Sequence, residues 1–527
     1  MRLLLRNGTI HTPTLSSFTA RSTARSAVRS TAMAVDDDTV TWIGDEAGAD
    51  HFVDNADNVV DLTGSLVTPA FVDAHVHLAQ TGLAARGVDL RGAASREEAL
   101  DRIARHATRS SDPVVLGYGW DETQWSPPEP FTGTDVDRAV HDRPAYLARV
   151  DVHSAIISAA LLARAPQLTS QQGWTGRGRV ERDAHHVARA AADALVTPAM
   201  RRAAIRHGLR AAATAGIGLV HELGAPHLSS PDDFALIDEI GRSEPVPQVV
   251  RYWGELGAYD LATEYECLGL AGDLCADGAI GSRTAALQQP YSDAVTRGHM
   301  YLDPTQIADH LIGCTRRGLQ AGFHAIGDRA VATTLSGLRA AAQRLGPAAV
   351  TAARHRLEHV EMIAPDDIDV LADLGVVASV QPAFDAAWGG HGRLYAHRLG
   401  MERASVMNPF AAMSRAGVAL AFGSDSPVTP MNPWAAVRAA AWHRTPSQRI
   451  DVRAAISAHT RGGWRAGKRD DAGWLAVGLP ASYAVWRFSP DPGDPDVPDL
   501  SPDAPSPTCL ATVVDGVTIH SDQGAHP

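Results

Sequence analysis

Short apolar runs that alternate with long helical stretches constrain the fold of this chain more than any other feature. Eight such runs occur between residues 66 and 426, and Ala-, Leu- and Arg-rich stretches of helical character lie between most of them. This alternation is typical of a parallel sheet with crossover helices, and eight strands fit a closed (β/α)8 TIM barrel of the α/β class. The predicted strands are LVTPAFVDAHVH, GIGLVHELG, PQVVRYWG, GDLCADGAI, LQAGFHAIGD, RHRLEHVE, GVVASVQPAF and VALAFGSDS.

The predicted barrel accounts for only part of the 527 residues, which are too many for one simple core. Strand-like runs at both ends of the chain, within residues 1–66 and 465–527, could pair into one small β-unit. The barrel would then occupy residues 67–464. The gap between its first two strands is too long for a single helix, so residues 80–196 are predicted to form an insertion within the barrel.

Two segments lack the pattern of a regular element. An Ala-, Ser-, Thr- and Arg-rich stretch from Ser16 to Ala34 is predicted to be a loose surface excursion. A Pro- and Asp-rich stretch from Ser489 to Pro507 cannot form a regular element and is predicted to be a loop.

Composition narrows the classes of function. The formal charge of −13 argues against non-specific nucleic-acid binding and gives no sign of a basic membrane-binding face. No stretch reaches the apolar length of a transmembrane helix, and the apolar core of the N-terminus is too short for a signal peptide. The four cysteines are scattered and form no CxxC pair, which favours buried free thiols. We therefore expect a cytoplasmic enzyme.

Histidines and carboxylates lie at the ends of several predicted strands. His75 and His77 are two residues apart at the end of the first strand, so their side chains would point to the same face. His324, His359 and Asp425 end the fifth, sixth and eighth strands. Because catalytic groups of barrels lie at the C-terminal ends of strands, these side chains should converge on one rim. Such a set of ligands predicts a divalent metal, most plausibly zinc, as one or two ions.

Each of these residues taken alone has a simpler interpretation. A single histidine at a strand end is more often a hydrogen-bonded rim residue than a ligand, and Asp425 in a Gly-Ser-Asp-Ser run could be a turn or helix cap. The ordered set on four strands outweighs those interpretations. A phosphate-binding barrel is a poorer alternative, because no glycine-rich phosphate loop follows the last two strands.

Several longer motifs carry a family resemblance. They are FVDAHVHL, GWDETQW, DVHSA, DGAIGSRTAAL, HAIGDRAV, RLEHVE and GSDSPVTPMNPW, and together they extend over nearly the whole chain. The chain resembles the amidohydrolase superfamily, and within it the amidohydrolase family 3 group that includes N-substituted formamide deformylases. The resemblance implies that His75, His77, His324, His359 and Asp425 are metal ligands, and that the terminal strands form the small β-sandwich of the family.

Two features depart from the family pattern. Family members often have a lysine that can be carboxylated, to bridge two metals, in a Lys-x-x-x-Asp-Gly motif on the fourth strand, where this chain has Asp273 followed by Asp277. Asp273 has a shorter side chain, so it could bridge two metals, bind one, or leave a site for a single metal. The closing motif of the family is degraded to GLPASYAVW, which affects a structural element only.

The resemblance also implies a reaction. It predicts a metal-dependent hydrolase that uses metal-activated water on carbon–nitrogen bonds other than peptide bonds, in an amide, formamide or cyclic amide. Asp425 would be the general base, and His359 would polarise the substrate if it is not a ligand. The alternative is a catalytically silent barrel that acts as a binding or regulatory protein, which only the change at Asp273 favours.

Residues outside the metal set are predicted to contact the substrate. Arg283, Trp120, Asp121 and His153 are the candidates, although Arg283 could instead form a structural ion pair and Trp120 could pack in the insertion. The expected partner is a small-molecule substrate, with a homodimer as a possible assembly and no role for nucleic acid or a membrane.

Overall fold

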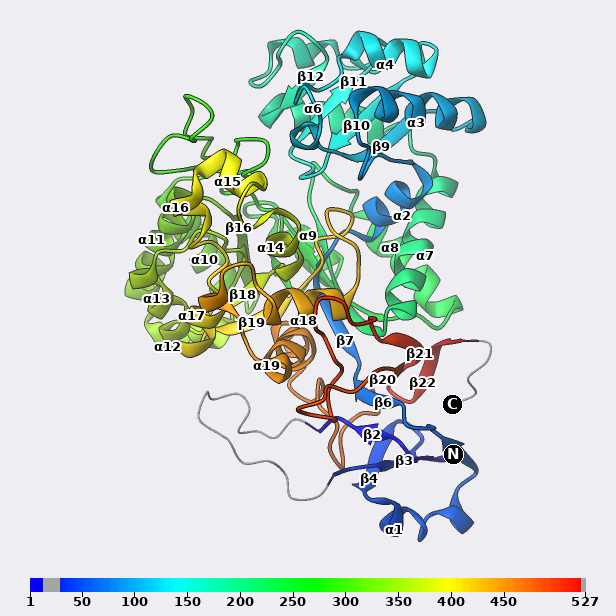
Figure 1. Cartoon of the computed structure of the whole chain (residues 1–527). Coiled ribbons are helices and arrows are strands. Elements are labelled where there is room, and N and C mark those ends of the chain that lie inside the picture. Colours follow the sequence, from blue (N-terminus) through cyan, green and yellow to red (C-terminus); the bar gives the residue numbers. More distant parts are fainter. Residues whose placement is uncertain (13–28, 523–527) are drawn as a thin grey trace.

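A parallel barrel forms the centre of the molecule in a computed structural model that describes residues 1–12 and 29–522 (Figure 1). Its sheet contains eight strands in the order β19-β18-β17-β16-β15-β14-β13-β7, so the predicted α/β barrel is confirmed. The strands are β7 (Phe71–Val76), β13 (Ile217–Gly224), β14 (Gln248–Trp253), β15 (Gly269–Leu270), β16 (Gln320–Ala325), β17 (Arg356–His359), β18 (Val377–Val380) and β19 (Ala419–Phe422).

Backbone hydrogen bonds between the first and last strands close the barrel at its C-terminal end. Asp425 N–H donates to the carbonyl of His75 at 2.7 Å, and His77 N–H donates to the carbonyl of Ser426 at 3.1 Å. The buried carboxylate of Asp73 adds a further tie, because it accepts the N–H of Ser424 at 2.8 Å. The closure therefore fixes the backbone of the first and eighth strands at the rim where functional groups are predicted.

Helices cover the outside of the barrel, as their apolar faces require. Two of the longer ones begin at clear capping residues, namely Thr197 before α7 and a capping box of Asp303 and Gln306 at α10. They are α2 (Leu78–Arg86), α7 (Pro198–Thr214), α8 (Asp232–Ser243), α9 (Tyr259–Glu264), α10 (Pro304–Arg316), α11 (Asp328–Leu345), α12 (Pro347–Ala353), α13 (Ile368–Asp373), α14 (Pro382–Trp388), α15 (Leu394–Leu399), α16 (Met401–Ala404), α17 (Phe410–Arg415), α18 (Pro433–Ala441), α19 (Val452–Ser457) and α20 (Gly463–Ala466).

Helix α2 is held unusually close to α7. A Cβ atom at Gly82 would lie 2.0 Å from the carbonyl oxygen of Ala204, so only glycine permits this approach. The N-cap of α2 is His77. The packing of α2 on α7 therefore helps to fix one of the predicted metal ligands.

The fourth barrel strand differs from the prediction. The strand is β15 at Gly269–Leu270, whereas the predicted run GDLCADGAI lies after it as an irregular segment. The left-handed backbone of Gly272, with φ of 87°, turns the chain away from the strand direction. Asp273 and Asp277 therefore lie beyond the strand and not within it.

The first predicted strand is divided between two sheets. β6 (Leu66–Pro69) pairs with β2 (Thr9–Ile10) and β20 (Tyr483–Arg487), whereas β7 enters the barrel. Two sheets, ordered β4-β3-β1-β5 and β2-β6-β20-β21-β22, share an apolar core and form the small β-sandwich built from both ends of the chain. Its other elements are β1 (Arg2–Arg6), β3 (Ala32–Asp36), β4 (Thr39–Gly44), β5 (Asn58–Asp61), β21 (Thr508–Val514), β22 (Val517–Ser521) and α1 (Glu46–Ala49).

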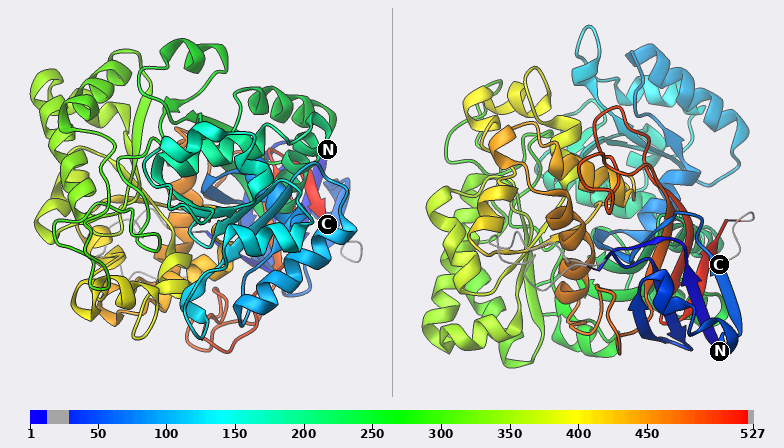
Figure 2. Two further views of the ribbon diagram at one scale, coloured as in Figure 1. Left: turned by 90° about the horizontal axis from the view of Figure 1, so that it is seen from above. Right: turned by 60° about the horizontal axis from the view of Figure 1, so that its bottom comes forward.

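The insertion is a separate mixed sheet with its own helices. It lies over one end of the barrel, on the side opposite the β-sandwich and both termini (Figures 1 and 2). The residue Gln80 belongs to α2, so the added structure begins after Arg86. It comprises β8 (Val88–Asp89), α3 (Arg96–Arg109), β9 (Val115–Trp120), α4 (Gly133–Val140), β10 (Ala145–Arg149), β11 (Ser154–Ile157), α5 (Ala159–Leu162), β12 (Arg179–Glu181) and α6 (Arg182–Asp193).

The two predicted irregular segments have different outcomes. Most of the stretch from Ser16 to Ala34 lies outside the described residues, and its end begins β3. Between β20 and β21, the stretch from Ser489 to Pro507 is a loop without a helix or strand. Across the described ranges, none of the helices is both long and apolar enough to cross a membrane.

Candidate metal centre and substrate pocket

Six histidines and aspartates from five barrel strands or the segments after them meet at one rim. His75 is on β7 and His77 follows it, His324 is on β16, and His359 ends β17. Asp273 and Asp425 come from the segments that follow β15 and β19. The parallel strands bring these positions together because their C-terminal ends share one edge of the barrel. We call these six residues the metal cluster.

Distances within the metal cluster suit shared coordination of cations. His75 Nε2 lies 3.4 Å from Asp273 Oδ1 and 3.4 Å from Asp425 Oδ1. His77 Nε2 lies 3.4 Å from Asp273 Oδ2 and 3.2 Å from Asp425 Oδ1. The two strand-1 imidazoles therefore face two carboxylates, which is the arrangement that a metal ion between them requires.

Asp273 belongs to two groups of potential ligands. In one group its carboxylate lies with His75 and His77, and in the other it lies with His324 and His359, with all the ligand atoms of each group within 4.8 Å of one another. A third group joins Asp425 to His75 and His359. The shorter side chain of Asp273 therefore reaches the position between both sets of histidines.

Several ligand atoms in the metal cluster are buried without a hydrogen-bond partner. They are His75 Nε2, His359 Nε2 and Asp273 Oδ1. A buried polar atom without a partner costs roughly 1–3 kcal/mol, so three in one place would be a substantial penalty if nothing bound there. The donor set of imidazole nitrogen and carboxylate oxygen matches what a divalent transition metal binds, and the residues fit such an ion.

The protonation behaviour differs within the cluster, because the carboxylates of Asp425 and Asp273 outweigh burial and raise the pKa of His75 and His77, whereas the pKa of His359 is lowered. Burial, with the neighbouring His324, lowers the pKa of His359 to about 3, so its imidazole is neutral and can bind a metal. Burial alone would raise the pKa of Asp273, but the nearby rings of His77 and His75 hold that pKa well below its usual value. The cluster therefore combines a neutral imidazole with an ionised carboxylate.

Partners behind the ligands fix the orientation of three imidazoles. His75 Nδ1 contacts Glu358 Oε2 at 2.9 Å, and His77 Nδ1 contacts the carbonyl of Leu223 at 2.8 Å. His359 Nδ1 contacts Gln381 Oε1 at 2.8 Å. In each case Nδ1 is engaged and Nε2 is directed to the cluster, as is usual for metal-ligating histidines.

Two cluster residues adopt strained backbone conformations. His359 has φ of 70° and Asp425 has φ of 54°, both in the left-handed region that L-residues seldom occupy. Such conformations cost roughly 1–3 kcal/mol each and concentrate at functional sites. The strained backbone at these two positions directs both side chains into the metal cluster.

Sequence reasoning missed the supporting residues. The motif RLEHVE indicated His359 as a functional residue but not Glu358. The side chain of Glu358 reaches from β17 to His75 on β7. Gln381 directly follows β18, so a polar residue at the end of the seventh predicted strand was an available signal. Asp277 is a structural residue, because its carboxylate accepts the backbone N–H groups of Ala286, Ile326 and Gly327.

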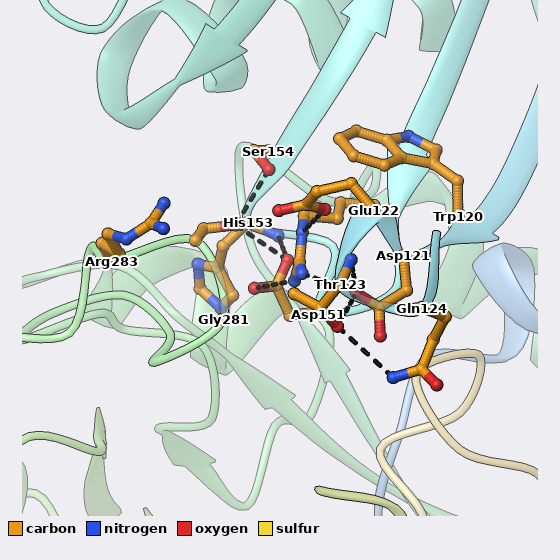
Figure 3. Close-up of polar contacts among 12 residues, drawn as sticks. Trp120, Asp121, Glu122, Thr123, Gln124, Asp151, His153, Ser154, Gly281 and Arg283 are labelled. Carbon is orange, nitrogen blue, oxygen red and sulfur yellow. Dashed lines mark hydrogen bonds and ion pairs between the residues drawn. The ribbon is translucent and has the colours of Figure 1, made fainter. Parts of the chain in front are cut away.

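The four predicted substrate contacts separate into two groups (Figure 3). His153 lies at the cluster, with its ring 5.1 Å from that of His324. Trp120 is buried in the insertion and donates to the carbonyl of Leu147, and Asp121 pairs with Arg149 at 3.0 Å. Arg283 pairs with Asp293 at 2.7 Å. Only His153 is therefore placed where it lines the pocket beside the cluster.

This pocket has walls from three parts of the chain. Asp151 and His153 come from the insertion, Ala279–Gly281 follows β15, and α14 and α15 supply mostly aromatic side chains. His324, His359 and Asp425 form its metal-cluster side. The free space is only about 20 Å³, room for about one water molecule. The pocket is therefore narrow in this conformation.

Two of the larger hollows outside this pocket differ in how they relate to it. One, of about 270 Å³, lies between the insertion and the loop at Ser426–Pro427 and shares Val428 with the pocket. The other, of about 720 Å³, is an open groove beside α7 and contains no residue of the metal cluster. The first is the one that could join the pocket to solvent.

Comparison with known proteins places the chain in a family. A model described as "Amidohydrolase family" matches residues 58–520, which include the barrel, the insertion and part of the β-sandwich. The resemblance found in the motifs is thereby confirmed.

Individual relatives extend over most of the chain. The putative amidohydrolase YtcJ of Bacillus subtilis is 26% identical, covering 83% of this chain and 86% of its own length. An N-substituted formamide deformylase of Arthrobacter pascens is 23% identical, covering 72% and 74% respectively. Among solved structures, an uncharacterised metal-dependent hydrolase from Pyrococcus horikoshii is 25% identical with a TM-score of 0.73, covering 93% of this chain and 98% of that one.

Proposed function

Because this chain belongs to the amidohydrolase family, we propose that it hydrolyses carbon–nitrogen bonds other than peptide bonds, in an amide, formamide or cyclic amide. The observation that carries the proposal is the convergence of buried, unpartnered ligand atoms on one rim beside a pocket. The similarity to a formamide deformylase supports the substrate class. The protein's own neutral and ionised ligands support a divalent metal, for which zinc is our proposal.

The metal cluster would hold one or two ions. His75, His77 and Asp425 would bind the first, His324 and His359 the second, and Asp273 would bridge them. A divalent ion bound there supplies a Lewis acid that activates water and polarises a carbonyl oxygen.

The chain's own residues would move the proton. Asp425 lies at the rim with an oxygen 3.2 Å from His77 Nε2 and faces the pocket, so it can accept a proton from the attacking water. It would then return that proton to the leaving nitrogen. His153 lines the same pocket, and burial beside His324 lowers its pKa to about 4, so a neutral imidazole is available to hydrogen-bond the substrate.

The alternative of a catalytically silent barrel rested on Asp273. That residue faces His75 and His77 at 3.4 Å and belongs to two potential ligand groups. A carboxylate at this position can itself bind a metal, so the substitution gives no support to the silent barrel.

A substrate screen with a matched variant tests the proposal. Purified protein, with its metal content measured, would be incubated with N-formyl amines, N-acyl amino acids, cyclic amides and ureas. Asp425→Asn keeps the size and one oxygen of the side chain but loses its basicity. It should retain the metal and lower kcat about 10²–10⁴-fold on any substrate found.

Two results would contradict this function. One is the absence of hydrolysis of all four substrate classes by protein that contains full metal. The other is near-normal kcat in Asp425→Asn, which would remove the proposed base while leaving the metal site intact.

A further inference from the structure

One carboxyl group in the pocket has no cationic partner. Glu361 lies two residues beyond His359, is 3% exposed and lines the pocket. Its Oε2 makes no hydrogen bond, and no Arg, Lys or His nitrogen in the described part of the chain lies within ion-pair distance of it. Its nearest polar neighbours, Tyr395 and Asn408, are neutral.

Other acidic residues near the pocket are compensated. Asp151 receives Arg149 at 3.1 Å and the hydroxyl of Ser282 at 2.8 Å. Asp385, on α14, accepts the backbone N–H of Arg444 at 2.7 Å and lies 3.5 Å from His443. Glu361 has the Tyr395 hydroxyl and the Asn408 amide as neighbours but no cation, and the acidic groups of Asp425 and Asp385 add negative potential around it. An isolated buried carboxyl group is costly unless something supplies the missing partner.

Aromatic rings line the same pocket. Phe384 and Trp388 on α14 have ring centroids 4.8 Å apart, and Trp388 and Tyr395 have centroids 6.1 Å apart. All three line the pocket with Glu361. Faces of aromatic rings attract cations, and rings combined with a carboxylate form sites for ammonium groups. The Tyr395 hydroxyl interacts with the carboxyl group of Glu361, so this ring lies beside the carboxyl group.

We propose that Glu361 and the rings of Phe384, Trp388 and Tyr395 form a subsite for a cationic nitrogen of the substrate. The substrate class is then a carbon–nitrogen compound that carries an ammonium group away from the bond to be broken. Glu361 supplies a charge-assisted acceptor, and the rings cover the adjoining carbon chain. The inference deepens the proposed function and rests on it only in taking this pocket to be the one that holds the substrate.

Binding of a small probe tests the subsite without turnover. Phenethylammonium would be titrated calorimetrically into the purified, metal-containing protein, with 2-phenylethanol as the neutral analogue. We expect the ammonium compound to bind at least about tenfold more tightly than the alcohol. Glu361→Gln should remove that preference, and Tyr395→Phe, which keeps the ring, should change it less than about threefold.

The design separates charge recognition from other effects. An amine that bound only to the metal would bind equally well to Glu361→Gln, and that result would overturn the subsite. If Glu361→Gln does not fold, the comparison of the two probes on the unaltered protein still decides, because equal affinities for both would also overturn it.

Failure of the subsite is distinguishable from failure of the proposed function. Probe binding that depends on Glu361, in a protein that hydrolyses none of the screened compounds, supports the subsite and removes the proposed reaction. Hydrolysis of amino-bearing and neutral formamides with equal kcat/KM in the unaltered protein and in Glu361→Gln supports the reaction and removes the subsite.

Discussion

The metal cluster and the buried ion pairs around Arg149 are both assembled from distant parts of the chain, but they differ in how fully their polar atoms are paired. Arg149 is completely buried and donates to Glu122 at 2.8 Å, to Asp121 at 3.0 Å and to Asp151 at 3.1 Å. Arg398 on α15 completes this group, which we call the charge network, by donating to the second oxygen of Glu122 at 3.0 Å.

The difference teaches how to separate a structural polar group from a functional one. Each carboxylate of the charge network receives an arginine N–H, so the network ties the insertion to the segment that carries Arg398 and needs nothing else. The metal cluster instead leaves His75 Nε2, His359 Nε2 and Asp273 Oδ1 without a hydrogen bond. Burial is equal in the two regions, and only the atoms without a hydrogen bond indicate an external ligand.

The largest expected effect on chemistry comes from removing the strand-1 histidines. In His75→Ala combined with His77→Ala, two imidazole ligands are lost, so metal content should fall below about one tenth of normal and hydrolysis should fall to background. Metal analysis and activity assays measure both. His310→Ala, which removes a buried histidine on α10 outside the cluster, is the control and should keep its metal. Full metal occupancy in the double variant would show that strand 1 does not bind metal.

An intermediate effect is expected from Asp273→Ala. If Asp273 bridges two ions, the protein should contain two metals per chain and the variant one or none. Activity should fall more than about 100-fold, since loss of an outer partner of a ligand already costs about 10–100-fold. Asp273→Asn, which keeps one oxygen, should retain more metal. A single metal per chain that is unchanged in Asp273→Ala would instead mean a mononuclear site held by His75, His77, His324 and Asp425.

The smallest effect on chemistry, but a large one on stability, is expected from Arg149→Met. The variant leaves buried carboxylates without their shared cation, which should destabilise the fold by about 3–5 kcal/mol, seen as a lower urea midpoint. Metal per chain should not change. Arg91→Met removes a surface pair with Asp89 and is the matched control, with a cost of about 0–1 kcal/mol. Loss of metal in Arg149→Met without loss of stability would erase the contrast between the two regions.

The metal cluster was predictable from sequence because its signals are local. His75 and His77 are spaced for one face of a strand, and His324, His359 and Asp425 each follow or end an apolar run. In a parallel barrel the C-terminal ends of all strands lie on one face, so the fold class alone brings these positions together. The same reasoning misplaced the fourth strand, since β15 is only Gly269–Leu270 and the turn at Gly272 is a tertiary constraint that the apolar run did not reveal.

The substrate contacts were less predictable, because motifs record a residue type and not its partner. Arg283 and Asp121 lie in recognisable motifs, yet each is paired with a charged residue whose own position depends on packing between the insertion and the barrel. Glu361 is the reverse case. It lies in the motif RLEHVE as an ordinary polar residue, and only the arrangement of α14 and α15 shows that it lines a pocket without a counter-ion.

The sequence by itself determined the barrel, the pairing of strands from both ends of the chain, and the candidate residues of the metal cluster. These features depend on strand periodicity and strand-end position, which are properties of short segments. The tertiary structure alone decided which polar atoms are paired. It placed Asp273 between two sets of histidines. It paired Asp121 and Arg283 with side chains of opposite charge, and it left Glu361 without a cationic partner. The physical reason is that a buried charge is stabilised by neighbours from distant segments, whose approach is fixed only when the whole core packs.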